Sequence, residues 1–507
     1  MFLRRKKNKS GTITVQVVEK TGRKNKILKI IGTSSFEKEL EDLIFEGKEF
    51  IESQTKQSSL DIPFDEDDFL LSSIKKSLRK ILVLGPELIL GKIFDDIGFS
   101  KIPDILFRHL VIARLVYPGS KLKTVQYLLQ YKGVHTHEDR IYRYMDKFKS
   151  QYEQSAIQTV FNHTKKILND KITISFYDIT TLYFEATEED ELRKCGFSKD
   201  GKHQNPQILL ALLVAENGYP LAYEIFDGST YEGHTIIPVI QSFKEKYKIS
   251  TLIIVADAGL LSKENIKQLI ELDYPFILGA RIKNENQKII DKIFSHSYTD
   301  KKTITIKKNN QLRLLVNYSS KRALHDEDNR RKGMTRLEKK IKMGKLNKQS
   351  LNSRGYNKYL KILNDIAVEI DKEAFEEDKK WSGLKGYITN SDLSPSQVLN
   401  NYRQLWQIEK AFRISKTDLR IRPIYHRLER RIRTHVCLAF CSYKLYKELE
   451  RLLKENEFYL STEQVLREIK TIYKMELRLP ESGKKESILV PLTKEQAHIL
   501  KLFGIDY

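Results

Sequence analysis

Three carboxylate residues lie where their side chains could carry chemistry. Asp178 interrupts the apolar, β-branched run SFYDITTLYFE, where a charge is costly unless it is paired or bound to a metal ion. Asp257 ends the apolar run LIIVADAGL, at the point where a strand should give way to a loop. The carboxyl ends of strands are where sites gather in α/β sheets. Glu409 lies in the predicted helix YRQLWQIEKAFRISK.

Two strand carboxylates and one helix carboxylate can converge on a single site. Hard oxygen ligands with open positions suit Mg²⁺ or Mn²⁺. Two such ions, about 4 Å apart, can clamp the attacking and leaving oxygens of an in-line phosphoryl transfer. The chain contains no CxxC pair, no HExxH and no GxxxxGK[ST], so neither a Cys/His metal site nor ATP use is indicated.

Each carboxylate also has a structural interpretation. A strand-end Asp often caps a turn or the next helix, which would account for Asp178 or Asp257 taken singly. For the helix, Glu409 could pair with Arg413 one turn later. Its neighbours would then form the apolar stripe that faces the core, namely Leu405, Ile408 and Phe412. The combination of three carboxylates favours the metal site over these separate explanations.

The segments around Asp178 and Asp257 predict an RNase H-like α/β core. A β-rich run near 172–186 is followed by two apolar runs split by Asn217-Gly218, a strong hairpin signal. A helix, a buried strand, a second helix and a further strand then follow as far as residue 283. Three antiparallel strands, a helix and a parallel strand are the order expected of such a core. We therefore assign 166–283 and 381–450 to the catalytic core.

The remaining segments are predicted to surround that core. Residues 284–380 form a β-rich insertion, with a strand pair and the basic stretch NRRKGMTRLEKKIKMGKLNK. Residues 1–69 form an N-terminal β-hairpin and helix. Residues 70–165 form a helical DNA-binding domain, in which Ser120 caps a helix. Residues 451–507 form a C-terminal helical tail. In the core, 394–419 is predicted to be one long helix capped by Ser394.

The composition points to a polyanionic partner. Lys and Arg total 89 against 67 acidic residues, a formal net charge of +22 over 507 residues. Nucleic acid is the first candidate and an anionic membrane surface the second. No apolar run is long enough to span a membrane, and the N-terminus has no secretory pattern. Three cysteines fit a reducing cytosol, so the expected location is cytoplasmic.

At these residues the chain resembles the DDE transposases of bacterial insertion sequences, in particular the cut-and-paste group with a Tyr, Arg, Glu, Lys signature. The resemblance places the family's carboxylates on Asp178 in FYDITT, Asp257 in VADAGL and Glu409. The signature Tyr falls on Tyr402 and the signature Lys on Lys416, which the family uses to contact DNA phosphate near the cut.

The resemblance is incomplete at the signature Arg, whose position holds Leu405. Arg403 is close in sequence but on another side of the helix, and with Arg413 it completes the basic residues expected to contact DNA. Trp406 is a candidate for stacking on a flipped base, although a packing role is the stronger interpretation. The segment GFSKDGKHQNPQILLAL resembles the one that follows the first Asp, which places Ser198 and Asp200 near the site.

Membership of this group implies a homodimer that brings two transposon ends together on double-stranded DNA. Two Mg²⁺ or Mn²⁺ ions held by Asp178, Asp257 and Glu409 would support cutting at each end. The freed 3′-hydroxyl would then attack target DNA, with or without a hairpin intermediate. The protein would act in the bacterial cytoplasm, at the nucleoid.

Two other functions fit the same sequence. A metal-dependent RNase H-like nuclease would share the three carboxylates but lack strand transfer. A non-catalytic DNA-binding protein would share only the basic surface. The insertion and the signature helix favour the transposase, and the presence of all three carboxylates argues against a decayed enzyme.

Overall fold

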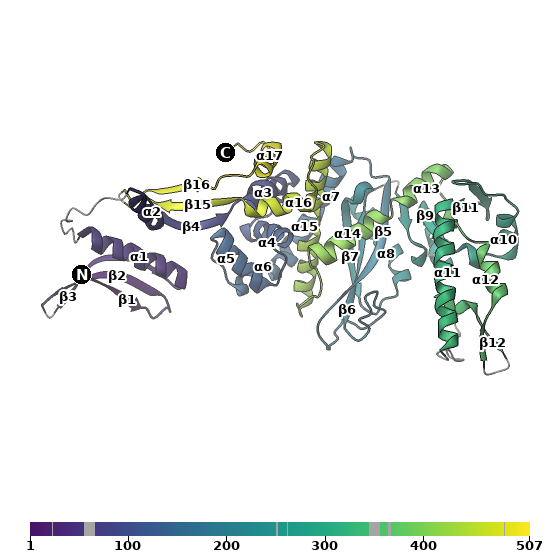
Figure 1. Ribbon diagram of the computed structural model, residues 1–507, viewed down its shortest axis with the longest axis horizontal. Coiled ribbons are helices and arrows are strands. Elements are labelled where there is room, and N and C mark those ends of the chain that lie inside the picture. The colour runs from purple at the N-terminus through teal and green to yellow at the C-terminus, as the bar shows by residue number, and fades with distance from the viewer. Residues whose placement is uncertain are drawn as a thin grey trace. The chain divides into compact units, whose positions relative to one another are not determined.

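The computed structural model describes residues 1–22, 24–54, 66–249, 252–260, 262–343, 355–363, 367–480 and 482–506 (Figure 1). By contacts the chain divides into two compact units. The first contains 1–85, 130–133 and 468–507, and the second contains 86–129 and 134–467. This division is coarser than the five segments that the sequence predicts, and those finer boundaries stay a prediction.

The first unit contains two small antiparallel sheets, and a helix packs against the first of them. In one, β1, β2 and β3 are paired in chain order, and in the other β15 lies between β4 and β16. The strands and the helices of this unit are β1 (Phe2–Lys7), β2 (Ile13–Thr21), β3 (Lys24–Ser34), α1 (Glu37–Gln54), α2 (Glu66–Ser77), β4 (Leu78–Val83), β15 (Tyr473–Arg478), β16 (Lys485–Leu489) and α17 (Lys494–Leu502).

One sequence prediction for this unit holds and one is wrong. The predicted N-terminal hairpin is present as β2 and β3, and the charged segment FLRRKK adds a third strand that pairs with β2. The 451–507 tail is not wholly helical, because β15 and β16 lie in it. Strand β15 pairs antiparallel with β4, from the far end of the sequence. Such a long-range pairing leaves no local signal beyond a weak alternation of residues.

The second unit begins with helices, as predicted. The helices of this region are α3 (Gly85–Ile97), α4 (Ile105–Val116), α5 (Lys121–Lys132), α6 (Glu138–Gln151) and α7 (Glu153–Ile167). The rings of Phe94, Phe99, Phe107 and Phe148 stack against one another in their core. The long helix α15 (Glu429–Glu455) packs against α4, α6 and α7, and it is buried along most of its length.

An eight-stranded mixed sheet carries the central part of this unit. Its strands run in the order β10-β11-β14-β9-β8-β5-β6-β7. The strands before the insertion are β5 (Ile174–Tyr183), β6 (Gln207–Val214), β7 (Pro220–Asp227), β8 (Ile253–Ala256) and β9 (Phe276–Ala280). β5, β6 and β7 are antiparallel, and β8 is parallel to β5 and to β9. Helices α8 (Ile236–Tyr247) and α9 (Lys263–Glu271) connect β7 to β8 and β8 to β9, which confirms the predicted strand order.

The insertion is part of this sheet rather than a separate body. Strand β14 (Leu384–Thr389) pairs with β9, and β11 (Arg313–Tyr318) and β10 (Thr303–Lys307) continue the sheet from it. The basic stretch forms the second half of helix α11 (Ser320–Lys342), and its last residues, 344–348, lie outside the described residues. The rest of the insertion comprises α10 (Gln287–Phe294), β12 (Leu360–Leu363), β13 (Ala367–Ile370) and α12 (Lys372–Lys379).

The predicted long helix over 394–419 is interrupted. It consists of α13 (Pro395–Arg403), α14 (Trp406–Arg413) and a short π-helical turn, η8 (Ile414–Asp418). The N-cap prediction for Ser394 is confirmed, with Gln397 completing a capping box. Around 404–405 the amides of Leu405 and Ile408 bond to carbonyls three residues back, which tightens the helix into separate segments.

Across the described ranges, no helix is both long enough and apolar enough to cross a bilayer.

Candidate active site

The register of two parallel strands brings Asp178 and Asp257 together. Tyr177 on β5 is the partner of Ala256 on β8, so the next residue on each strand is one of the two aspartates. The apolar strands on both sides are buried, so the sheet fixes the backbone at this point. The convergence of the two aspartates that the sequence predicts is therefore present in the fold.

Asp178 is the more buried of the two aspartates. Burial, with a further contribution from the negative charges of Asp257 and Glu232, raises its pKa to about 6. The ammonium group of Lys199 acts in the opposite direction. A strongly perturbed carboxyl beside a second carboxylate is a common mark of a functional site. Asp257, by contrast, is exposed at the end of its strand.

Glu409 reaches the same neighbourhood from helix α14, which packs against β5 and β6. Its side chain is exposed. Both Asp257 and Glu409 act electrostatically on the ammonium of Lys385 and on the hydroxyl of Tyr402. Asp257 thus acts directly on Asp178, and it shares two neighbouring side chains with Glu409.

Tyr402 links helix α13 to the strand carboxylate. Its hydroxyl donates a hydrogen bond to Asp257 Oδ1 at 3.1 Å, and its ring lies edge-on to Tyr387 at 4.8 Å between centroids. Burial raises the pKa of Tyr402, and the charge of Asp257 raises it further, so the hydroxyl keeps its proton and remains a donor. This contact fixes one oxygen of Asp257 and leaves the other available.

The donor atoms of the site fit a hard divalent cation. Three carboxylates from two strands and a helix supply oxygen ligands and leave positions open for substrate and water. Within the ranges that the structure describes, no three His, Cys, Asp or Glu side chains already stand close enough to hold a metal ion. The fit therefore rests on the chemistry of the three carboxylates and on their position in one region of the fold. Their side chains would have to rotate toward one another before they could hold an ion together.

Lys416 lies beside the site and is held by an acidic partner. Its Nζ lies 3.5 Å from Asp200 Oδ2, and Arg422 forms an ion pair with the same carboxylate. Although burial alone would raise the pKa of Asp200, the two cations hold it below its usual range. The placement of Asp200 near the signature Lys agrees with the sequence analysis.

The other expected DNA-contacting residues are dispersed. Arg403 and Arg413 are exposed, and no ion pair joins Arg413 to Glu409 among the described residues. The pairing of Glu409 with Arg413, offered above as the structural interpretation, is therefore absent. Leu405 is buried, as the apolar stripe requires.

Trp406 is not part of the buried core, because it is 51% exposed. It lines a pocket of about 610 Å³ together with Lys410, Lys447 and Arg451. It is the first residue of α14, just after the break in the predicted helix. Its stacking on a flipped base stays a prediction.

Sequence reasoning missed three charged residues of the site. Lys199 donates to the carbonyl of Ile179 at 2.7 Å and pairs with Glu232 at 3.1 Å, so both lie beside Asp178. Lys385 lies on β14, after the insertion. Glu232 lies in a short helical turn beyond the loop that follows β7, so the strand-end rule that identified Asp257 does not single it out. Lys199 and Lys385 are in polar, Lys-rich segments and carry no comparable signal.

Comparison with known proteins gives one family match. The family described as "Transposase DDE domain" matches residues 170–445, more than half of the chain and all three carboxylates. No curated protein matches the chain in sequence.

Among solved structures, the chain is similar to a piggyBac transposase synaptic complex with hairpin DNA. The identity is 11% and the TM-score 0.38, over 76% of this chain and 78% of the other. It is also similar to a Mos1 transposase paired-end complex with the left transposon end. There the identity is 10% and the TM-score 0.16, over 46% of this chain and 66% of the other.

Proposed function

This chain belongs to the family of transposases with a DDE domain, and from that premise we propose how it acts. It binds the ends of a transposon, hydrolyses phosphodiester bonds there, and joins the freed 3′-hydroxyl ends to target DNA. The observation that carries the proposal is the parallel register of β5 and β8, which sets Asp178 beside Asp257. Asp257 and Glu409 in turn both act on the hydroxyl of Tyr402.

The catalytic residues are Asp178, Asp257 and Glu409, on a core of the RNase H-like type. They would hold Mg²⁺ or Mn²⁺, and a pair of such ions would supply the Lewis acidity for in-line attack at phosphorus. Tyr402 orients Asp257 through its hydrogen bond. The raised pKa of Asp178 means that the charge on this carboxylate is poorly compensated in the free protein, so a bound cation would stabilise its ionised form.

DNA contact would use cations that the free protein already holds near the site. Lys416 shares Asp200 with Arg422. An incoming DNA phosphate would compete with Asp200 for the ammonium group of Lys416. Lys416 would then exchange the carboxylate for the phosphate as its anionic partner. Arg403, Arg413 and Trp406 are exposed and would contact DNA further from the carboxylates. The net charge of +22 would supply the longer-range attraction.

The finer assignment follows the signature residues. We place the chain in the group marked by Tyr, Arg, Glu and Lys, with Tyr402, Glu409 and Lys416 in the expected positions and Leu405 in place of the Arg. As in that group, it would come from a bacterial insertion sequence and work as a homodimer on two ends at once. It would act on the nucleoid in the bacterial cytoplasm.

The test is DNA cleavage by the full chain with the DNA that flanks its gene. Wild type, Glu409→Gln and the control Glu271→Gln are incubated with Mg²⁺ or Mn²⁺, and the breaks are mapped. Glu271 is an exposed glutamate at the end of α9 that pairs with Lys267 and has no part in the proposed site. We expect cuts at inverted repeats with wild type and control, and none with Glu409→Gln.

Three other outcomes would contradict parts of the proposal. Metal-dependent cutting without end specificity would indicate a nuclease that lacks strand transfer. Binding without cutting in either metal would indicate a non-catalytic DNA-binding protein. Cutting by Glu409→Gln at the wild-type rate would remove Glu409 from the site while leaving the family assignment intact.

A further inference from the structure

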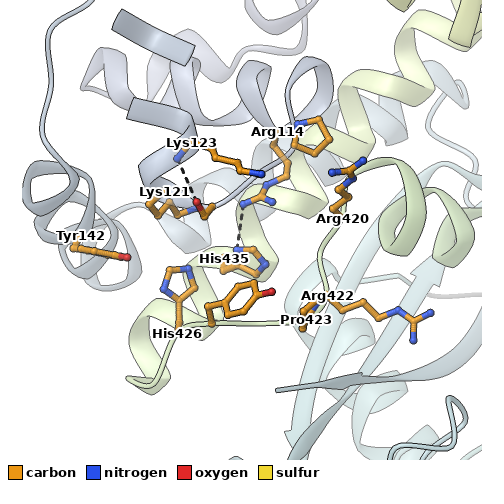
Figure 2. Close-up of a pocket in the computed structure, with 13 residues that line it drawn as sticks. Arg114, Lys121, Lys123, Tyr142, Arg420, Arg422, Pro423, His426 and His435 are labelled. Carbon is orange, nitrogen blue, oxygen red and sulfur yellow. Dashed lines mark hydrogen bonds between the residues drawn. The ribbon is translucent and has the colours of Figure 1, made fainter. Parts of the chain in front are cut away.

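A basic pocket of about 420 Å³ has a lining that includes none of the three carboxylates (Figure 2). It is bounded by the end of α4, the start of α5, the start of α15 and the segment 420–426 between η8 and α15. Its charged lining includes Arg114, Lys121, Lys123, Arg420 and Arg422, and no carboxylate lines it. Five cations around one cavity without an acidic partner in its wall are unusual, because like charges repel.

Two of these cations are buried. Arg114 is 6% exposed and Lys121 is 5% exposed. Taking a charged group out of water is costly unless a counter-charge compensates for it. Burial lowers the pKa of Lys121 well below its ordinary value, and the neighbouring charge of Arg114 lowers it further. A bound anion would counteract both effects, because it would compensate the buried positive charges.

The hydrogen bonds of the wall leave Lys121 without a partner. Arg114 lies 3.4 Å from His435 Nδ1 and donates weakly to the carbonyl of Leu419 at 3.5 Å. His435 Nε2 lies 2.9 Å from the carbonyl of Ile421, so this nitrogen carries the proton and Nδ1 accepts from Arg114. Among the described residues, the ammonium of Lys121 has neither a hydrogen bond nor an ion pair.

The backbone adds to the positive potential. Helix α5 begins at Lys121, and its first turn contains no acidic residue. The amide of Lys123 donates to Ser120 Oγ at 3.2 Å, and the other amides of the first turn remain orphan donors. The helix therefore directs its positive end toward the pocket without a side-chain anion to neutralise it.

The positive charges around the two histidines of the pocket argue against a metal ion as its occupant. His426 and His435 lie 5.2 Å apart between ring centroids, a spacing that could suggest a metal pair. Burial, with the charges of Lys121 and Arg114, lowers the pKa of His426 to about 3, so the ring is neutral. Asp146, the carboxylate that acts on His426, is held by Arg430 and Arg431. A metal ion here would face buried cations and no carboxylate ligand.

We propose that this pocket binds a backbone phosphate of the DNA, with Lys121 and Arg114 as its buried contacts. The proposal rests on the proposed function, and it names a phosphate site separate from the carboxylates. Continuity with the active site favours DNA as the source of the phosphate. Arg422 lines the pocket and shares Asp200 with Lys416, and Ile424 bridges to Phe184 just beyond β5. One DNA strand could follow this segment from the carboxylates into the pocket.

The test is the salt dependence of duplex binding by the full chain. Lys121→Met keeps the length of the side chain and removes its charge. Each phosphate contact contributes about 0.9 to the slope of log K against log salt. We expect Lys121→Met to bind DNA more weakly than wild type, and its salt slope to be smaller by the contribution of about one phosphate contact. When the salt concentration rises fourfold, the factor by which its affinity falls should therefore be roughly threefold smaller than the factor for wild type.

The matched control is Lys444→Met. Lys444 is also a buried lysine, but it donates to Thr164 Oγ1 at 2.9 Å and lies outside the pocket. Thermal unfolding of both variants monitors folding. An unchanged slope in Lys121→Met, or an equal fall in both variants, would overturn the proposal.

A second measurement uses inorganic phosphate and distinguishes the sources. If the pocket takes free phosphate instead of DNA, phosphate will raise the melting temperature of wild type saturably but not that of Lys121→Met, and the two DNA slopes will agree. That outcome would overturn the DNA contact and leave an anion site. If wild type binds no DNA, the proposed function fails, and the phosphate titration alone decides whether the pocket is an anion site.

Discussion

At the scale of single residues, Asp178 carries a charge where the fold leaves little water to solvate it. Its pKa in the folded chain, about 6, lies above the ordinary value of 3.8. A group whose folded pKa is raised binds more protons in the native state than in the unfolded state. The free energy of unfolding of the metal-free protein therefore falls as the pH rises from the unfolded to the folded pKa of Asp178. Above the folded pKa, the full loss of stability due to this carboxylate is reached.

Asp178→Asn should relieve that cost. With metal chelated, we expect the variant to be more stable than wild type at pH about 8, on the order of 1–3 kcal/mol. The gain should be smaller at pH about 5, where the folded wild-type carboxyl is largely protonated. Urea unfolding at the two pH values measures both differences. A gain that does not depend on pH would show that titration of Asp178 is not its cause.

The hydroxyl of Tyr402 should matter for activity more than for folding. Tyr402→Phe removes the donor to Asp257 and leaves the ring contact with Tyr387 intact. We expect cleavage to slow by roughly tenfold, as for a lost hydrogen bond to a charged group. Tyr387→Phe is the control, because no hydrogen bond of its hydroxyl is present among the described residues. Equal rates for the two variants would remove the positioning role of Tyr402.

At the scale of elements, the carboxylates are carried by two kinds of segment, continuous strands and an interrupted helix. Strands β5 and β8 are continuous and buried, whereas the helix that carries Tyr402 and Glu409 is interrupted between them. The capping box at Ser394 is therefore the local device that fixes the start of α13. Helix α17 has a similar box in the first unit, with Thr493 and Gln496.

These two caps allow a matched comparison. Ser394→Ala and Thr493→Ala should each cost about 1 kcal/mol of stability in their own unit. Only Ser394→Ala should also slow cleavage, because α13 presents Tyr402 to Asp257. Hydrogen exchange of each helix and a cleavage assay provide the readouts. A similar loss of cleavage in Thr493→Ala would mean that the effect is not local to the site.

The elements also show what the sequence could and could not predict. Asp178 and Asp257 could be identified because a charged residue in an apolar run is costly unless it has a partner or a function. Ser394 could be identified because a helix cap is set by residues that are close in sequence. The break at Leu405 arises from a change of hydrogen-bond partner within residues that still favour helix. Neither Lys385 nor Lys121 was predicted, because their significance comes from residues distant in sequence that the fold brings beside them.

At the scale of the whole molecule, the excess of positive charge should dominate DNA affinity. The described part of the basic stretch forms an exposed helical surface on α11. Four of its cations have no ion-pair partner among the described residues, and they are Arg336, Lys339, Lys340 and Lys342. Their contribution is separate from the pocket at Lys121.

Replacing these four residues by Gln should weaken DNA binding uniformly across sequences. The salt slope should fall by up to about 3.6, if each one contacts a phosphate. Lys379→Gln with Lys380→Gln is the control, because both lysines pair with glutamates on α12. A binding isotherm at several salt concentrations measures the slope. A salt slope equal to that of the control would show that this surface of α11 faces solvent and does not contact DNA.

The pairing of β4 with β15 has a consequence for how the protein is made. Residues 78–83 emerge from the ribosome long before 473–478, yet they are neighbours in one sheet. While the rest of the chain is synthesised, β4 has no strand partner, and its open edge must be protected from other chains. A product that stops before Tyr473 never completes this sheet. Premature termination before Tyr473 therefore leaves a molecule that contains Asp178, Asp257 and Glu409. Its first unit, however, cannot form the sheet of β4, β15 and β16.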